Sequence, residues 1–79
     1  MQQIVHILKQ NDPITLSIIQ QHAKGACVEV VLIHEATSVV LDHVTVFELE
    51  DDTKKTDYPT LSYKELVEKI FRADTTVTW

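Results

Sequence analysis

The stretch IVHILKQNDPITLSIIQQHAKGACVEVVLI, residues 4 to 33, decides the fold that the sequence predicts. It begins and ends with short aliphatic, β-branched runs, at 4–8 and 28–33, which are typical of strands buried on both faces of a parallel sheet. Between them a helix is expected to begin at Asp12, whose side chain can cap free N–H groups, with Pro13 suited to the first helical position. Strand, helix and strand within about 30 residues predict a βαβ unit with parallel strands.

This first helix is expected to span 12–24 and to end at Gly25, the only glycine, in a left-handed conformation. Farther along, a strand is predicted at 44–49 and a polar loop at 50–60. A second helix is expected to follow Ser62, which has capping-box spacing to Glu65. A final strand is predicted at 75–79. The apolar residues of the second helix repeat with helical spacing and make it clearly amphipathic: Tyr63, Leu66, Val67, Ile70 and Phe71.

The segment from His34 to Asp42 is ambiguous between a strand and a short helix, and a short helix is favoured because α/β alternation needs a crossover there. The predicted fold is a small three-layer α/β domain with a mostly parallel four-stranded sheet, in the order β-α-β-α-β-α-β, formed by residues 1–79 as one domain. A parallel sheet needs cover on both faces. Few helices are available to supply it, so we expect part of the apolar surface to close against another subunit.

Composition narrows the range of functions. Seven Lys and Arg residues against twelve Asp and Glu residues give a net charge of −5, so direct nucleic-acid binding and docking on an anionic membrane are not expected. One cysteine excludes an intrachain disulfide framework. No apolar run approaches the roughly 20 residues that span a bilayer, and no signal peptide is visible. These features predict a cytoplasmic protein.

In open α/β sheets ligands bind beyond the carboxyl ends of the strands. Those ends carry Lys9 to Asp12, His34 to Ser38, Glu50 to Thr53, and Trp79. His34 and Glu35 are the candidate ligand-binding pair, with a solvated turn or an interface contact as the other interpretation. No metal site and no cofactor is expected, since metal-ligand spacing and a glycine-rich phosphate loop are both missing from the sequence.

Cys27 is the only thiol and hence the only candidate thiol nucleophile. It precedes the second strand, at the opposite edge of the sheet from the expected ligand crevice. The other interpretation is a small buried hydrophobic side chain packed under the first helix. His6, within the first strand, is expected to be a core side chain with satisfied hydrogen bonds.

Several short motifs together resemble the DsrE/DsrH-like sulfur-relay family, most nearly its TusB/DsrH branch. They are the opening strand followed by Asn11-Asp12-Pro13, the run Val31-Leu32-Ile33-His34, the third strand with the acidic residues that follow it, the run from Leu61 to Leu66, and a final Trp79. The resemblance implies a parallel α/β fold, assembly into dimers or heterohexamers, and a part in persulfide transfer during tRNA thiolation or sulfur oxidation. It also places the sulfur-carrying cysteine of DsrH-type members in the first helix, where this chain has none.

The resemblance therefore predicts a noncatalytic subunit that works through protein–protein contacts beside related sulfur-relay subunits, as a homo- or hetero-oligomer. Trp79, Phe47 and Tyr58 are the candidate interface anchors, because aromatic side chains dominate binding energy in interfaces. Two alternatives stay open: a persulfide-carrying sulfurtransferase that uses Cys27, and a small-ligand module at the crevice of His34.

Overall fold

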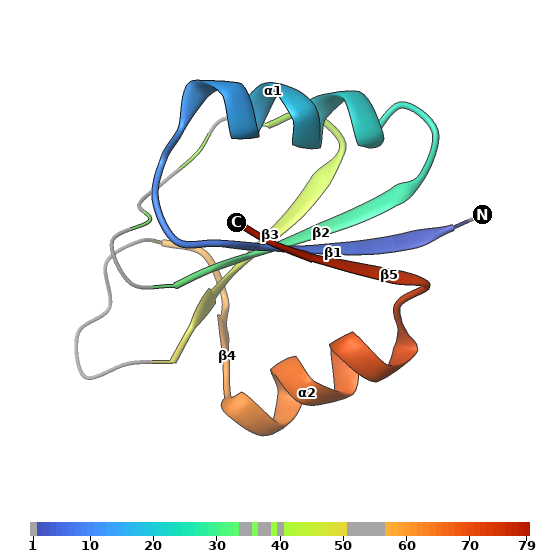
Figure 1. Ribbon diagram of the computed structural model, residues 1–79. Coiled ribbons are helices and arrows are strands. Elements are labelled where there is room, and N and C mark those ends of the chain that lie inside the picture. The colour runs from blue at the N-terminus through green and yellow to red at the C-terminus, as the bar shows by residue number, and fades with distance from the viewer. Residues whose placement is uncertain (1, 34–35, 37–38, 40, 51–56) are drawn as a thin grey trace.

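The computed structural model describes residues 2–33, 36, 39, 41–50 and 57–79. Within these residues the chain forms one parallel sheet with a helix against each face (Figure 1). The strands lie side by side in the order β4-β3-β2-β1-β5, and all four neighbouring pairs are parallel. The elements are β1 (Gln3–Leu8), α1 (Pro13–His22), β2 (Cys27–Leu32), β3 (Val44–Leu49), β4 (Thr60–Leu61), α2 (Tyr63–Arg72) and β5 (Thr75–Thr78).

The predicted α/β class with a parallel sheet is confirmed, but the sheet has five strands and not four. The additional strand is β4, which falls at the end of the segment predicted as a loop. It is two residues long and follows Pro59, so it has no alternating pattern to reveal it. The backbone N–H of Glu48 donates to the Pro59 carbonyl, and that of Glu50 donates to the Leu61 carbonyl. These bonds align β4 with β3.

The helix start at Asp12 is confirmed. The Asp12 Oδ1 atom accepts the Ile14 backbone N–H at 2.9 Å, and Pro13 occupies the first helical position. The predicted end is wrong in two respects. The helix stops at His22 with Ala23 as a right-handed cap, and Gly25 does not have a positive φ. The chain instead leaves the helix through successive right-handed turns, so the glycine is not required there for its conformational freedom.

The favoured short helix after β2 falls largely on residues outside the described ranges. Of the described residues in that segment, Ala36, Val39 and Leu41 belong to neither a helix nor a strand. Ala36 and Val39 are buried, and they pack on the α1 side of the sheet.

Alternation along the strands produces two cores, as expected for strands buried on both faces. The α1-side cluster contains Ile19 of α1 and inward residues of three strands: Ile4, Leu8, Val28, Val30, Leu32 and Val46. The α2-side cluster contains Val5, Ile7, Val31, Leu61 and Leu66. Among the described residues the α1-side cluster has nine buried members and the α2-side cluster has five. The core on the α2 side is therefore the smaller of the two.

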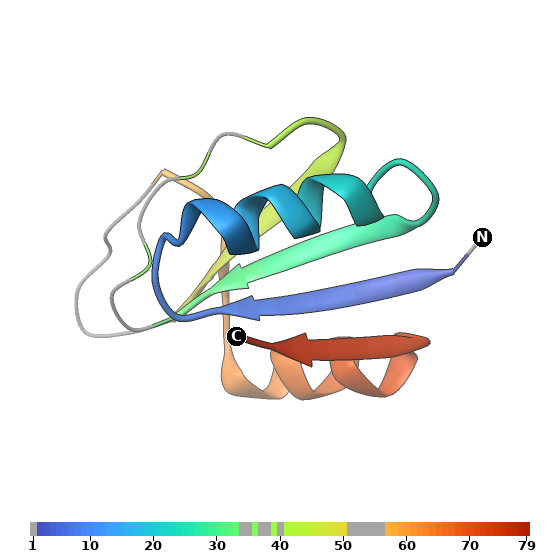
Figure 2. The same ribbon diagram turned by 45° about the horizontal axis from the view of Figure 1, so that its top comes forward.

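Figure 2 shows β5 as an edge strand with α2 behind and below it, while β4 forms the other edge. The carboxyl ends of β1 and β5 lie next to each other and close to the start of α1. Neither helix in the described part of the chain is long and apolar enough to cross a bilayer.

Candidate functional site

The helix α2 begins with the capping box that the sequence predicts. The Ser62 hydroxyl accepts the Glu65 backbone N–H at 3.2 Å, and the Glu65 carboxylate accepts the Ser62 backbone N–H at 3.1 Å. The pKa of the Glu65 carboxyl is lowered, first by the hydrogen bond from the Ser62 backbone N–H, then by the Ser62 side chain, with a smaller contribution from the charge of Lys69. The capping box therefore fixes the residue at which α2 begins.

Most of the apolar stripe of α2 faces solvent. Tyr63 is 70% exposed, Val67 is 47% exposed and Phe71 is 84% exposed. Leu66 is the only buried residue of the helix. A helix that served only to cover its own sheet would turn its apolar stripe inward. We call Tyr63, Val67 and Phe71 the outer stripe of α2.

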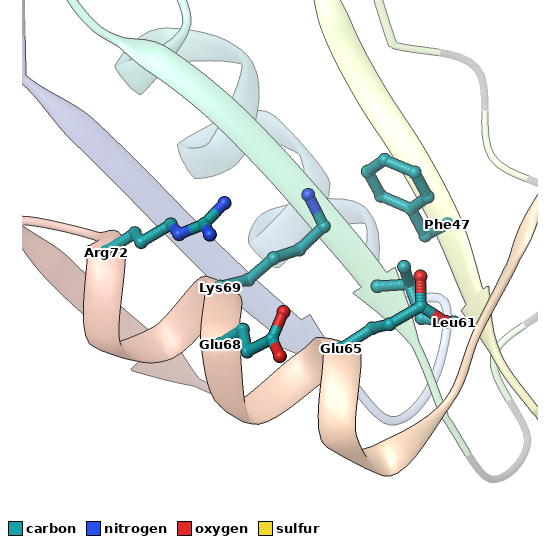
Figure 3. A pocket seen from close by; sticks show the side chains of 6 residues that line it. All are labelled: Phe47, Leu61, Glu65, Glu68, Lys69 and Arg72. Carbon is teal, nitrogen blue, oxygen red and sulfur yellow. The ribbon is translucent and has the colours of Figure 1, made fainter.

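A groove of about 240 Å³ lies along another side of α2 (Figure 3). It is lined by Phe47, Leu61, Glu65, Glu68, Lys69 and Arg72. Figure 3 shows the Lys69 side chain reaching from the helix toward Phe47. Its ammonium lies 4.4 Å from the centroid of the Phe47 ring and 2.7 Å from the Glu29 carboxylate. Because Lys69 is already paired, it serves to hold α2 on the sheet and is not a free binding charge.

The carboxyl edge of the sheet carries a second pocket, of about 200 Å³. Its lining residues are Lys9, Gln10, Asp12, Thr15 and Trp79. The structure thus brings together two of the predicted strand ends, residues 9–12 and Trp79. Sequence reasoning missed Thr15, because a threonine in the first turn of a helix carries no signal of its own.

The predicted ligand pair His34–Glu35 lies outside the described residues. Glu50 is described and exposed, and it does not line the pocket at the carboxyl edge. Within the described part of the chain, no three or more His, Cys, Asp or Glu residues are grouped so that they could hold a metal ion.

His6 is fully buried in β1 and has a hydrogen-bond partner on each ring nitrogen. The Trp79 indole N–H donates to His6 Nδ1 at 2.9 Å, and His6 Nε2 lies 3.1 Å from His22 Nδ1. The pKa of His6 is lowered to about 4, mainly because burial disfavours the charged ring and secondly because of His22. The prediction of a satisfied core histidine is confirmed.

The three predicted interface anchors lie at different places. Phe47 packs against the α2-side cluster, whereas Tyr58 and Trp79 pack against the α1-side cluster. The Tyr58 hydroxyl donates to the Val39 carbonyl at 2.6 Å, which ties the segment after β2 to the segment before β4. The anchors therefore do not form one patch, and each of the three is half-buried.

Cys27 is exposed at the start of β2, so the interpretation of a buried side chain under the first helix is wrong. Its backbone N–H donates to the Gln2 carbonyl, which places it at the amino edge of the sheet. The pocket lies at the carboxyl edge, so Cys27 and the pocket are at opposite ends of the parallel strands.

Comparison of the chain with protein-family models, with curated proteins and with solved structures finds no match.

Proposed function

We propose that this chain is a noncatalytic subunit of an assembly and works through protein–protein contacts made by the outer stripe of α2. The observation that carries the proposal is the exposure of Tyr63, Val67 and Phe71 on a helix that buries only Leu66. Contiguous exposed apolar side chains on a soluble domain mark interaction surfaces.

The energy available from this stripe is of the right size for association. Burying one large apolar side chain stabilises a complex by about 1.5 to 3 kcal/mol. Three such residues from each of two copies would supply about 6 to 12 kcal/mol once their partial exposure is counted. The loss of translational and rotational freedom costs about 4 to 15 kcal/mol. The stripe therefore provides a core for an interface, and polar contacts at its border are needed as well.

Charges beside the stripe suit a second α2 helix in antiparallel orientation. Lys64 and Glu68 are exposed and stand one turn apart. In a two-fold contact centred near Val67, Lys64 of one copy faces Glu68 of the other, while Tyr63 meets Phe71. A related subunit with the same pattern on its helix would satisfy the same contacts, which gives a hetero-oligomer in place of a homo-oligomer.

The setting that we propose is a cytoplasmic sulfur-relay type of assembly, acting in tRNA thiolation or sulfur oxidation, in which a partner subunit carries the reactive thiol. The motifs described above support this setting, as does a parallel sheet whose first helix follows Asn11-Asp12 and begins at Pro13. The first helix has no cysteine, which favours a noncatalytic role beside a catalytic partner.

The association is tested by light scattering coupled to size-exclusion chromatography. We expect the wild-type chain at about 100 µM to have the mass of a dimer, and Val67→Glu to have the mass of a monomer, because the substitution places a charge in the middle of the apolar contact. Gln21→Glu, at an exposed position on α1, is the matched control and should stay dimeric. A wild-type monomer that also fails to join related sulfur-relay subunits would contradict the proposal.

The alternative of a persulfide carrier is favoured by one observation, the exposure of Cys27. Intact-mass measurement after incubation with a cysteine desulfurase and cysteine distinguishes the two roles. A noncatalytic subunit keeps its mass. A stoichiometric gain of one sulfur that disappears in Cys27→Ser would replace the noncatalytic proposal with the carrier.

A further inference from the structure

The pocket at the carboxyl edge is separate from α2 and from the association proposed above. It lies where β1 and β5 end beside each other and α1 begins. Its volume is about 200 Å³. Sites for drug-sized ligands and cofactors have about 300 to 1,000 Å³. The size therefore suits a small metabolite better than a nucleotide.

Thr15 supplies an unused polar group in the wall of this pocket. Its side chain is 8% exposed, and no group in the described part of the chain hydrogen-bonds its hydroxyl. Every fully buried side-chain nitrogen and oxygen among the described residues does have a partner. The Thr15 hydroxyl must therefore keep contact with open space, and the space that Thr15 lines is the pocket. A nearly buried hydroxyl without a protein partner is suited to a ligand.

Side chains of both charge signs line the pocket. Lys9 contributes an ammonium, and the start of α1 contributes the positive end of the helix dipole. Asp12 contributes a carboxylate, of which Oδ1 accepts the Ile14 N–H and Oδ2 is left for another donor. The Trp79 indole forms an apolar wall. A simple anion would be opposed by Asp12, and a simple cation would be opposed by Lys9.

We propose that this pocket binds a small zwitterion of the α-amino acid class. The ligand carboxylate lies toward Lys9 and the start of α1 and accepts a hydrogen bond from the Thr15 hydroxyl. Its ammonium donates to Asp12, and its aliphatic side chain packs on Trp79. Neither charge of the ligand is then left without an opposite charge in the pocket.

Trp79 is the only tryptophan of the chain, so its fluorescence reports on the pocket directly. The probes are L-valine, isovalerate, which lacks the ammonium, and isobutylamine, which lacks the carboxylate. We expect L-valine to change the fluorescence with saturation in the millimolar range, and each of the other two to bind at least tenfold more weakly. No saturable change with L-valine, or equal binding of isovalerate, would overturn the proposal.

Substitutions at Thr15 test the contact that carries the inference. We expect Thr15→Val to weaken L-valine binding about tenfold, because the hydroxyl is lost, and Thr15→Ser to restore it. Ser17→Ala, at an exposed position of α1, is the control and should bind like the wild type. Thr15→Val should fold normally, since its hydroxyl has no partner among the described residues. Unchanged binding by a folded Thr15→Val protein would contradict the assignment.

Discussion

At the scale of single residues, the hydrogen bonds of His6 determine its protonation. An indole N–H can only donate, so His6 Nδ1 must accept from Trp79 and carries no proton. The proton of the neutral ring is then on Nε2, which donates to His22 Nδ1. A second proton on His6 would have to go to Nδ1 and would break the bond that ties Trp79, just after β5, to β1.

This arrangement predicts a loss of stability in mild acid. The pKa of His6 is about 4 in the folded chain and 6.5 for an unperturbed histidine, so between these values the unfolded state binds more protons. Stability is therefore present above about pH 6.5 and falls as the pH drops toward 4. We expect a decrease of about 2 kcal/mol in the free energy of unfolding between pH 7 and pH 5. Urea titrations at both values measure it.

The control separates His6 from the other histidines. His6→Phe should unfold with much less dependence on pH over this range, whereas His43→Asn, at an exposed residue with φ of 59°, should keep the wild-type dependence. An equally steep decrease in His6→Phe would assign the effect to other groups.

The sequence predicts the environment of single residues better than their partners. The aliphatic neighbours of His6 indicate that it is buried, and this is correct. Trp79 is 73 residues away in sequence, so no local pattern could pair it with His6. At Gly25 the conformation predicted from the local sequence is wrong. A glycine after a helix suggests a left-handed end, yet the turns from Gln21 to Gly25 close without a positive φ.

At the scale of elements, the start of α2 could be predicted, but its orientation on the sheet could not. The capping box depends on residues three apart, and these are visible in the sequence. Glu29 of β2 lies opposite α2, and its carboxylate accepts a hydrogen bond from Lys69. The residues of the outer stripe are exposed on the same helix. Lys69 and Glu29 are 40 residues apart, so no local pattern could pair them.

This pairing predicts a measurable coupling between α2 and β2. The side chains of Lys69 and Glu29 are 24% and 22% exposed, so their ion pair is screened less than a fully exposed one. We expect a double-mutant cycle of Lys69→Met and Glu29→Gln to give a coupling of about 1 kcal/mol in the free energy of unfolding. Lys69→Met also removes the ammonium from the Phe47 ring, and this loss cancels in the cycle because it occurs with either residue at position 29.

Lys64→Met in a cycle with the same Glu29→Gln is the matched control, because Lys64 is exposed on the first turn of α2. Its coupling should be zero within error. Equal coupling in the two cycles would mean that net charge, and not the contact with Lys69, holds the helix.

At the scale of the whole molecule, the strand order places the two helices on opposite faces of the sheet. The chain places β2, β3 and β4 successively on one side of β1 and then returns through α2 to place β5 on the other side. Among the described residues, one helix of ten residues, α2, lies on its face of the sheet. Alternating strands and helices predict the class of fold, but nothing local predicts this return to the other edge. The expectation of incomplete cover came from the small number of helices.

The exposed outer stripe of α2 predicts that stability depends on protein concentration. If the outer stripe of α2 is buried in a dimer, dissociation must accompany unfolding, and mass action raises the Tm as the chain becomes more concentrated. We expect the Tm of the wild type to rise by several degrees between about 10 µM and 1 mM in calorimetry, because a hundredfold change shifts the equilibrium by about 2.7 kcal/mol. Phe71→Glu should have a Tm independent of concentration, since its charge prevents burial of the stripe. Lys24→Glu, an exposed change away from α2, should retain the concentration dependence. A wild-type Tm that stays constant over the same range would show that the exposed stripe does not mediate self-association, and the partner would then have to be a different subunit.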